Sequence, residues 1–321
     1  MSFTYEQIEK IYDQNMMDLI FKAHTVHREN FDPNEMQVST LLNIKTGGCP
    51  ENCAYCPQSA HYNTGLQKEA LMSVDDILEK AKIAKENGAT RFCVGTAWRS
   101  PVKRDMQHIV DVIKGINHLG LESCATLGML TKEQAETLKE AGLEYYNHNI
   151  DSSEDFYKKI ISTRTYEQRL ETLQNVRDSG MKVCCGGIVG MGETKQDRIN
   201  FLRQLVTLSA PPESVPINKL IRVKGTPLEN AKEIDNTEII RTIATARIIL
   251  PKSRIRLSAG RTEFSDEMHL MCFFVGANSI FFGDKLLTTK NPGTNHDLEL
   301  LAKFNMKTQN TSDANVHSQV S

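Results

Sequence analysis

The chain has no long apolar run and no strong excess of charge of either sign. Its longest apolar run covers residues 270–275, far short of the roughly 20 residues that a membrane-spanning helix needs. The formal net charge of −2 favours neither a nucleic-acid surface nor an anionic membrane as a partner. The first residues also lack the basic segment and apolar core of a secretory signal. We therefore expect a cytoplasmic protein that binds neither nucleic acid nor membrane.

Disulfide bonds are not expected either. Eight cysteines in a cytoplasmic chain are better explained as metal ligands or buried thiols. The length of 321 residues suits one large barrel or two ordinary domains. A content of 40% hydrophobic and 24% charged residues is typical of a soluble globular protein.

Three cysteines lie close together in the stretch Cys49-Pro-Glu-Asn-Cys53-Ala-Tyr-Cys56, which follows an apolar segment and two glycines. Thiolates favour iron–sulfur clusters, zinc or cuprous copper. A structural zinc ion and a cubane [4Fe–4S] cluster both usually take four protein ligands, but no fourth cysteine or histidine follows within a few residues. Three thiolates on a cubane would leave one iron free to hold a small molecule. The alternative is a zinc loop with a distant fourth ligand.

Strand and helix patterns alternate along most of the chain. Four of the predicted helices end at a glycine followed by an apolar run, as helix C-caps often do. The predicted strands cover residues 40–44, 91–95, 121–126, 144–150, 182–189, 214–220, 254–258 and 278–282. Eight strands with helices between them predict an α/β fold of the (β/α)8 TIM-barrel type, with an open doubly wound sheet as the alternative.

The ends of the chain differ from this pattern. Helical spacing of apolar residues predicts one helix over residues 5–27. We therefore divide the chain into an N-terminal helical extension (1–38), the barrel (39–302) and a tail (303–321). The polar composition of the tail predicts a disordered segment.

Strand alternation predicts which side chains face the barrel interior. The residues that face outward must be apolar because they meet the helices. This rule points a polar set inward: Arg91, Cys93, Glu122, Cys124, Thr126, Asn147, Asn149, Asp151, Cys184, Asn218, Arg254, Arg256 and Ser258. It points Cys185 outward, and Cys272 lies in an apolar helical run. Burial of such a polar set without partners costs a few kcal/mol per group, so we expect the interior to hold a metal centre, a cofactor or a substrate.

The three-cysteine spacing, with Tyr55 as an aromatic residue before the last cysteine, resembles the signature of radical S-adenosylmethionine enzymes. Longer stretches resemble the biotin synthase family within that superfamily. They are residues 145–151 (YYNHNID), 186–193 (GGIVGMGE), 211–218 (PPESVPIN), 223–227 (VKGTP), 256–261 (RLSAGR) and 276–281 (GANSIF). The similarity runs from the first predicted strand to about residue 292.

The resemblance implies a [4Fe–4S] cluster on Cys49, Cys53 and Cys56, with S-adenosyl-L-methionine on its open iron. It implies a second, [2Fe–2S], cluster deep in the barrel, which donates sulfur to dethiobiotin in the final step of biotin biosynthesis. The implied ligands of that cluster, which are also the implied catalytic residues, are Cys93, Cys124, Cys184 and Arg256. From residue chemistry alone, Arg256 would be a counter-charge to an anionic cluster, because guanidinium has no lone pair to donate.

Further roles follow from the same resemblance. The implied cofactor-binding residues are Tyr55, Asn149, Asp151, Gly190 and Glu193. The implied substrate-binding residues are Asn147, Asn149, Asn218, Thr288 and Thr289. Turn asparagines, a helix N-cap at Asp151 and plain capping by the two threonines are the structural alternatives. After the second strand, Gly95-Thr96-Ala97-Trp98 departs from the Gly-Gly-Glu that many radical enzymes use for the methionine amine, which leaves the amine contacts open.

The resemblance also implies a homodimer and a flavodoxin or ferredoxin as electron donor. A lipoyl synthase or a relative of the hydrogenase maturases is a second enzyme hypothesis, although a lipoyl synthase should carry an extra N-terminal cysteine cluster and no cysteine precedes Cys49. A non-enzyme hypothesis is a redox-sensing binding protein stabilised by zinc or by a cluster.

Overall fold

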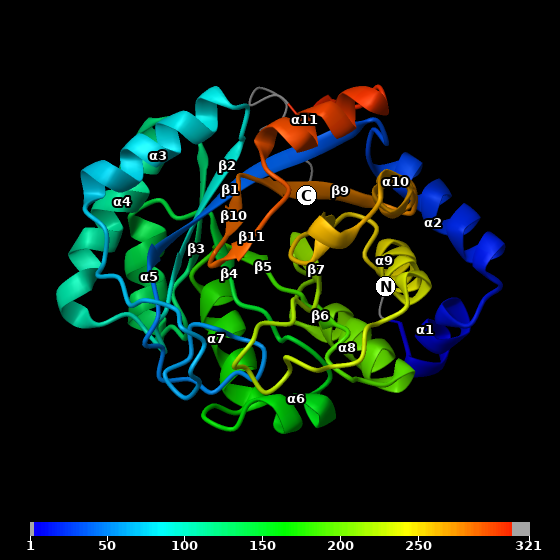
Figure 1. The fold of residues 1–321 in the computed structure, drawn as a ribbon, viewed down its shortest axis with the longest axis horizontal. Coiled ribbons are helices and arrows are strands. Elements are labelled where there is room, and N and C mark those ends of the chain that lie inside the picture. Colours follow the sequence, from blue (N-terminus) through cyan, green and yellow to red (C-terminus); the bar gives the residue numbers. More distant parts are fainter. Residues whose placement is uncertain (1–2, 310–321) are drawn as a thin grey trace.

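The computed structural model describes residues 3–309, and its centre is a closed parallel barrel (Figure 1). Strand β1 pairs with β2 on one side and with β9 on the other, so the sheet closes on itself. The strands are β1 (Glu35–Lys45), β2 (Arg91–Thr96), β3 (Glu122–Thr126), β4 (Tyr145–Asn147), β5 (Lys182–Cys184), β6 (Gly187–Val189), β7 (Ser214–Lys219), β8 (Arg254–Leu257) and β9 (Ala277–Phe282). Since β5 and β6 share one position in the barrel, the predicted eight-stranded (β/α)8 architecture is confirmed.

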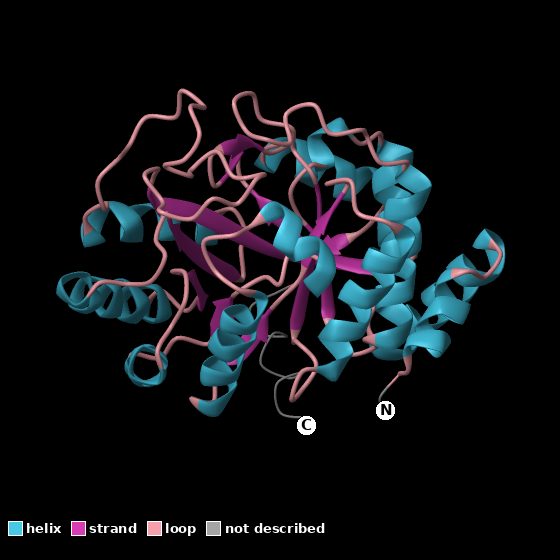
Figure 2. Ribbon diagram, turned by 90° about the horizontal axis from the view of Figure 1, so that it is seen from below, coloured by secondary structure: helices cyan, strands magenta, loops and turns pink. Residues whose placement is uncertain are grey.

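Helices surround the barrel (Figure 2). They are α1 (Tyr5–Tyr12), α2 (Met16–Asn30), α3 (Val74–Glu86), α4 (Met106–His118), α5 (Lys132–Glu140), α6 (Glu154–Ile160), α7 (Tyr166–Asp178), α8 (Lys195–Thr207), α9 (Asn236–Ile249), α10 (Asp266–Phe274) and α11 (Thr294–Lys303). Several begin at a threonine whose hydroxyl accepts a backbone N–H two or three residues into the helix, as Thr131 and Thr165 do. The glycines at the ends of α3, α4, α5 and α7 all have positive φ, as expected of C-caps.

The strand predicted over residues 182–189 is interrupted between β5 and β6. At Gly186, an added Cβ would lie 1.9 Å from the carbonyl oxygen of Pro216 on β7. The two backbones therefore approach more closely than any side chain allows. The Gly186 carbonyl instead accepts the N–H of Ile150, at 3.1 Å. The interruption brings residues that follow β4 against the barrel wall.

The predicted N-terminal helix is wrong in one respect, because it breaks into α1 and α2 at residues 13–15. Arg241 on α9 donates to the carbonyl groups of Tyr12 and Gln14, the latter at 2.9 Å, so the freed backbone acceptors are satisfied. Helix α1 packs against α8 and α9, and α2 packs against α9. The extension is thus attached to the outer layer of the barrel, and β1 starts at Glu35, earlier than predicted.

The C-terminal part of the chain returns to the sheet. After α11, β12 (Lys307–Thr308) pairs in parallel with Glu35 and Met36 at the start of β1. A disordered tail from residue 303 was therefore predicted too early, and its remaining residues, 310–321, lie outside the described part of the chain. A short hairpin, β10 (Lys285–Leu286) and β11 (Thr289–Lys290), follows β9 and was not predicted.

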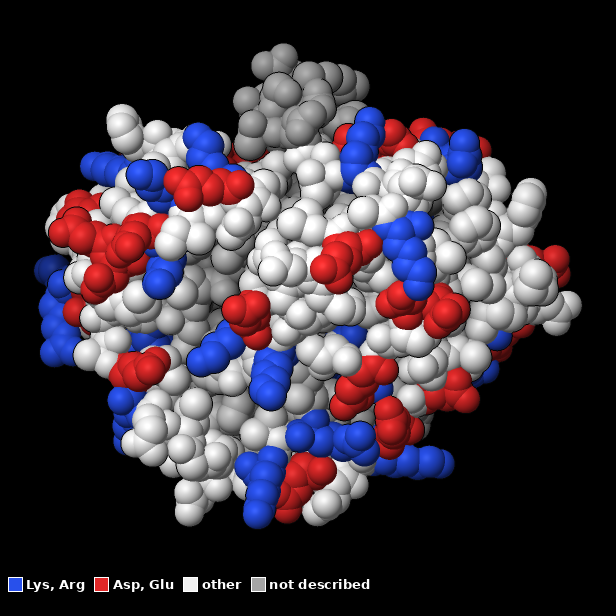
Figure 3. Space-filling model, turned by 45° about the horizontal axis from the view of Figure 1, so that its top comes forward, with Lys and Arg blue, Asp and Glu red and all other residues white. Residues whose placement is uncertain are grey.

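The surface carries both signs of charge. Figure 3 shows Lys and Arg side chains interspersed with Asp and Glu side chains over one face of the molecule. Within residues 3–309, none of the helices combines the length and the apolar character that crossing a bilayer requires.

One buried histidine makes stability depend on pH. His27 on α2 is 1% exposed, and neither of its ring nitrogens has a hydrogen-bond partner among residues 3–309. Burial, assisted by the charge of Arg247, lowers the pKa of His27 to about 3. The folded protein therefore holds this ring neutral well below neutral pH.

Because the ordinary pKa of 6.5 exceeds that of folded His27, the unfolded chain binds the proton more tightly, and acid favours unfolding. Between pH 7 and pH 5 this residue alone should lower the free energy of unfolding by about 2 kcal/mol. We expect His27→Leu to flatten the stability–pH profile in this window. The exposed His118 on α4 provides the control, His118→Gln, which should leave the profile unchanged. Urea unfolding at each pH measures both, and an unaltered slope in His27→Leu would contradict this assignment.

Candidate functional site

A cavity of about 300 Å³ opens inside the barrel and extends to the loop that carries the first three cysteines. All but two of the predicted site residues line it. They are Cys49, Cys53, Tyr55, Cys56, Cys93, Cys124, Asn147, Asn149, Asp151, Cys184, Asn218, Arg256, Thr288 and Thr289. The two exceptions are Gly190 and Glu193. Residues from distant parts of the chain therefore converge on one site, as the strand alternation predicts.

The three-cysteine loop follows β1 and is braced by the side chain of Gln58. The amide oxygen of Gln58 accepts the N–H of Gly47 at 3.1 Å, and its backbone carbonyl accepts the N–H of Cys49 at 2.9 Å. Gly47 and the next glycine have φ near +70°, a conformation that suits glycine. Burial raises the pKa of the Cys56 thiol to about 12, so a positive partner is needed to hold this group as a thiolate.

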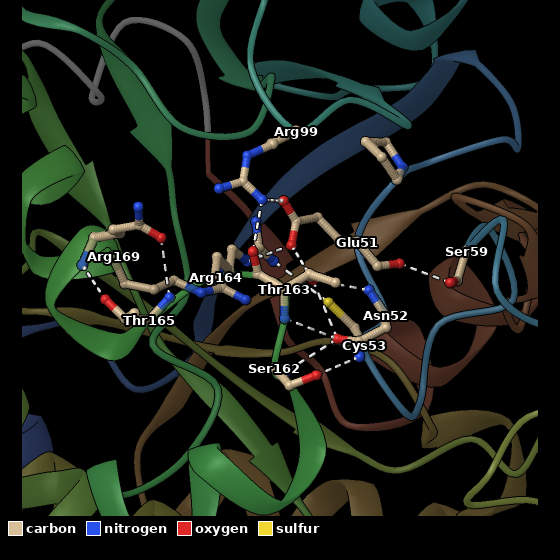
Figure 4. Close-up of polar contacts among 12 residues, drawn as sticks. Glu51, Asn52, Cys53, Ser59, Arg99, Ser162, Thr163, Arg164, Thr165 and Arg169 are labelled. Carbon is tan, nitrogen blue, oxygen red and sulfur yellow. Dashed lines mark hydrogen bonds and ion pairs between the residues drawn. The ribbon is translucent and has the colours of Figure 1, made fainter.

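A second layer of polar contacts fixes the same loop (Figure 4). The buried carboxylate of Glu51 accepts Nη1 of Arg99 at 2.8 Å and also the hydroxyl of Thr163. The side-chain oxygen of Asn52 accepts the backbone N–H groups of Ser162, at 2.9 Å, and of Thr163. Arg164 lies next to them, with Nη2 3.4 Å from Sγ of Cys53. The residues between α6 and α7 thus clamp the cysteine loop and place a positive charge beside a thiol.

A buried ion pair joins the loop to the barrel. Asp151 has a φ of +66°, and its carboxylate accepts the hydroxyl of Tyr55 at 2.8 Å and Nη2 of Arg169. Arg169, at the start of α7, also donates to the carbonyl of Asn149 at 2.6 Å. Burial, together with the Asp151 carboxylate, raises the pKa of Tyr55. The structure therefore brings together three residues predicted to bind the cofactor, through an arginine that was not predicted.

The inner wall of the cavity holds the other three thiols of the predicted set. Cys93 on β2 and Cys124 on β3 are direct cross-strand partners, and Cys184 lies on β5. All three are at most 2% exposed. Cys185, one residue further, packs in the outer core as predicted. Cys272, within α10, is also buried in that core and does not line the cavity.

Arg256 on β8 completes this wall. Its Nε donates to the hydroxyl of Ser279 at 2.9 Å and its Nη2 to that of Ser39 at 3.1 Å. No carboxylate of residues 3–309 forms an ion pair with it. Burial opposes ionisation of Cys93, but its hydrogen bond with Cys124 and the charge of Arg256 lower its pKa. An arginine that lacks an acidic partner beside three thiols suits an anionic group bound between them.

The donor set can be tested against the groups implied by the sequence. Within residues 3–309, no three His, Cys, Asp or Glu side chains are placed to hold one metal ion. A cubane binds each of its thiolates on a different iron, so its ligands need not converge on a point. Three thiols on a glycine-containing loop, and three more beside an arginine on the barrel wall, have the chemistry that iron–sulfur clusters require.

The asparagines differ in how much hydrogen-bonding capacity they retain. Asn218 donates to the carbonyl of Gly187 and accepts from the N–H of Ala259, both at 3.0 Å. Asn147 donates to Thr126 at 3.0 Å, while its Oδ1 is buried with no partner among the described residues. Asn147 is therefore the asparagine with a free acceptor at the cavity. The capping alternative holds for Thr289, whose hydroxyl donates to the carbonyl of Leu286 at 3.1 Å.

Gly190 and Glu193 do not reach the cavity wall. The carboxylate of Glu193 turns back and accepts the N–H groups of Gly190 at 2.9 Å and Met191 at 2.7 Å. Arg198 on α8 lies 3.2 Å from the same carboxylate and balances its charge. A direct contact of Glu193 with a cofactor is thus not supported, because its oxygens are used within its own turn.

Comparison with known proteins identifies the family. Residues 43–205 match the model of the Radical SAM superfamily, and residues 216–307 match the Biotin and Thiamin Synthesis associated domain. A biotin synthase of Idiomarina loihiensis is 56% identical over 99% of this chain and 93% of its own length. The chain belongs to the biotin synthase family. A second member, from Coxiella burnetii, is 57% identical over 94% of each chain.

Solved structures of other proteins share the fold of this biotin synthase family member. A methylornithine synthase superposes with a TM-score of 0.84 over 99% of this chain and 97% of its own, at 18% identity. The [FeFe]-hydrogenase maturase of Carboxydothermus hydrogenoformans gives a TM-score of 0.82 over 96% of this chain and 76% of its own, at 16% identity. Membership of the biotin synthase family makes the chain a radical SAM enzyme of biotin biosynthesis, for which the superfamily implies S-adenosylmethionine and a [4Fe–4S] cluster.

The Asp151–Arg169 pair should be strongly coupled energetically. Both side chains are at most 5% exposed, and loss of one partner leaves the other as an unpaired buried charge, at a cost of about 3 kcal/mol or more. We expect Asp151→Asn and Arg169→Met each to lower the free energy of unfolding strongly. The double variant should lose far less free energy of unfolding than the sum of the two single losses. A urea double-mutant cycle measures this coupling.

The exposed pair Lys303–Asp266, with a separation of 2.6 Å, provides a matched control. Its charges are hydrated, so its coupling should be much weaker. Equal coupling in the two cycles would show that burial does not strengthen the pair at the site.

Proposed function

We propose that this enzyme inserts sulfur into dethiobiotin to form biotin, the final step of biotin biosynthesis. In this proposal Cys49, Cys53 and Cys56 hold the [4Fe–4S] cluster, while a [2Fe–2S] cluster rests on the barrel wall. The proposed ligands of the [2Fe–2S] cluster are Cys93, Cys124, Cys184 and Arg256. The observation that carries the proposal is one continuous cavity with three thiols on the loop and three thiols beside an unpaired arginine on the wall.

When bound, S-adenosylmethionine and the [4Fe–4S] cluster supply a 5′-deoxyadenosyl radical, and the [2Fe–2S] cluster supplies the sulfur atom. The residues of the chain bind the clusters, orient the cofactor and the substrate, and enclose the site. Arg256 offers a positive charge that no carboxylate of residues 3–309 neutralises, and so favours an anionic cluster. Asn147 offers a free amide oxygen to the N–H groups of the ureido ring. The buried wall keeps water away from a species that attacks almost any C–H bond.

The cofactor end of the cavity is organised around Asp151. Its carboxylate is oriented by Tyr55 and Arg169, and we propose that it accepts the ribose hydroxyl groups. Asn149 uses its amide oxygen for the N–H of Gly186 at 3.0 Å, so its amide nitrogen is the group left for the cofactor or the substrate. Thr288 and Thr289 line the cavity from the hairpin and are proposed to face the substrate carboxylate. The hydroxyl of Thr288 is the one offered to that carboxylate, because the hydroxyl of Thr289 already donates to the carbonyl of Leu286.

The remaining assignments rest on family membership. We propose that the enzyme is a cytoplasmic homodimer and that a flavodoxin or ferredoxin reduces its [4Fe–4S] cluster. The homodimer and the electron donor follow from the family resemblance alone.

An anaerobic single-turnover assay tests the proposal. Reconstituted enzyme with S-adenosylmethionine, reductant and dethiobiotin should form about one biotin or fewer per monomer, as the [2Fe–2S] absorbance falls in step, because the cluster is the sulfur source. Biotin and the absorbance are followed together. Deoxyadenosine without biotin would keep the radical chemistry and reject this substrate. A colourless protein loaded with zinc would reject both clusters.

Two neighbouring cysteines provide a sharp test of the sulfur source. Cys184→Ala removes a thiol from the cavity wall, whereas Cys185→Ala removes one from the outer core. We expect Cys184→Ala to lose biotin formation at least about 100-fold while it still cleaves S-adenosylmethionine, and Cys185→Ala to keep near-normal yield. Biotin and deoxyadenosine are quantified in the same samples. Wild-type biotin yield from Cys184→Ala would refute the role of the wall thiols.

A further inference from the structure

The β10–β11 hairpin enters the mouth of the barrel. Figure 1 shows β10 next to β1, and contacts between β1 and β10 agree with this view. Leu286 is 6% exposed and packs in the interior cluster with Cys93, Cys124, Tyr145 and Phe281. The hairpin therefore contacts the residues of the cavity wall directly and forms one side of the site.

The next residue, Leu287, has an unusual backbone. Its φ is +57°, a left-handed conformation that non-glycine residues seldom adopt and that costs on the order of 1 kcal/mol for a leucine. Such a conformation persists only where the surrounding structure holds it. Leu287 also lines the cavity, so its side chain is turned toward the site despite being 37% exposed.

Gly95 on β2 provides the space for that side chain. A Cβ added at Gly95 would lie 2.8 Å from Cδ2 of Leu287, too close for two carbon atoms that are not bonded. The same Cβ would lie 3.8 Å from Cδ1 of Leu41, which is ordinary contact. Cys93, two residues earlier on the same strand, faces the cavity, so strand alternation places position 95 on the same side. The leucine thus occupies space that is open because residue 95 has no side chain.

We propose that Leu287, seated on Gly95, is a latch that holds the hairpin against the barrel and sets the length of the substrate chain that the cavity admits. The contact fixes Leu287, and through it the adjacent Thr288 and Thr289 at the end of the cavity. Apolar side chains of Leu41, Phe281 and Leu286 line the same region. The chemistry suits an aliphatic chain that ends in a carboxylate. This inference rests on the proposed function, and it assigns Gly95 and Leu287 as positioning residues.

Gly95→Ala is the direct test. It should displace Leu287 and move the hairpin outward, which lengthens the cavity. We expect KM for dethiobiotin to rise about tenfold. A dethiobiotin homologue with one more methylene group in its chain should gain at least about tenfold in kcat/KM relative to dethiobiotin, the lower end of the effect that one methylene group has in a fitted pocket. Unchanged KM and unchanged chain-length preference would overturn the latch.

A matched control puts the same clash elsewhere. In Gly115→Ala on α4, the new Cβ would lie 2.5 Å from Cδ1 of Leu78, in the outer helix layer. This variant should lower stability but leave chain-length preference unchanged. If it shifts the preference as Gly95→Ala does, the effect is general loosening of the fold and the latch is rejected.

Leu287→Ala is an independent test of the contact between residues 95 and 287, and it adds no bulk to the site. It removes the methyl groups that a new Cβ at position 95 would strike, so Gly95→Ala should have little further effect on KM in a Leu287→Ala background. Additive effects of the two changes would show that the residues do not act through their mutual contact. The same variant answers the question if Gly95→Ala does not fold, since it alone should raise KM for dethiobiotin and widen the accepted chain length.

A readout without substrate separates the latch from the proposed function. Hydrogen–deuterium exchange of residues 285–290 in the reconstituted enzyme should be faster in Gly95→Ala and Leu287→Ala than in the wild type and in Gly115→Ala. If the wild type forms no biotin but the variants show this exchange pattern, the proposed substrate is rejected and the latch is kept. If the wild type forms biotin but hairpin exchange is unaltered in both variants, the proposed function is kept and the latch is rejected.

Discussion

The structure depends on how charge is accommodated inside the barrel, where water is excluded. Arg91 meets Glu122 at 2.9 Å at the start of the neighbouring strand, and Arg169 meets Asp151 beside the cysteine loop. Arg256 is different, because the described residues give it the hydroxyls of Ser39 and Ser279 and the face of the Phe281 ring, but no carboxylate. A buried cation without an anion costs several kcal/mol. An anionic group bound at this wall would supply the missing negative charge, and this is the physical argument for the proposed cluster there.

The same requirement explains which parts of the site could be predicted from sequence. Strand alternation is a strict geometric rule, so it placed Cys93, Cys124 and Cys184 on the cavity wall and Cys185 in the outer core. This prediction required only that the apolar residues of each strand be recognised as those that face the helices. The barrel was predictable for the same reason, since its strands and the helices between them show their own local patterns. The prediction was reliable wherever one residue's direction follows from its neighbours in the chain.

Long polar side chains that reach the site from other elements could not be predicted in this way. Arg169 lies in the first turn of α7, where an arginine would ordinarily be expected to face solvent, yet it is 4% exposed and contacts Asp151, 18 residues earlier. Glu51 and Thr163 meet across 112 residues. Neither contact has a periodicity, because both depend on how loops fold over the barrel. The hairpin after β9 was missed similarly, since a leucine with positive φ contradicts local preference and depends on the space above Gly95.

Cys184 and Cys185 show why position, and not residue type, decides chemistry here. They are adjacent in sequence, both are buried, and burial raises the pKa of both thiols. Only Cys184 faces Arg256 across the cavity, and the charge of that guanidinium opposes the effect of burial. Cys185 packs among apolar side chains of the outer core. One residue step in a strand thus separates a thiol that lies beside a positive charge from one that fills space. A barrel strand can therefore place reactive and inert thiols side by side without mixing their roles, since the sheet itself separates the two environments.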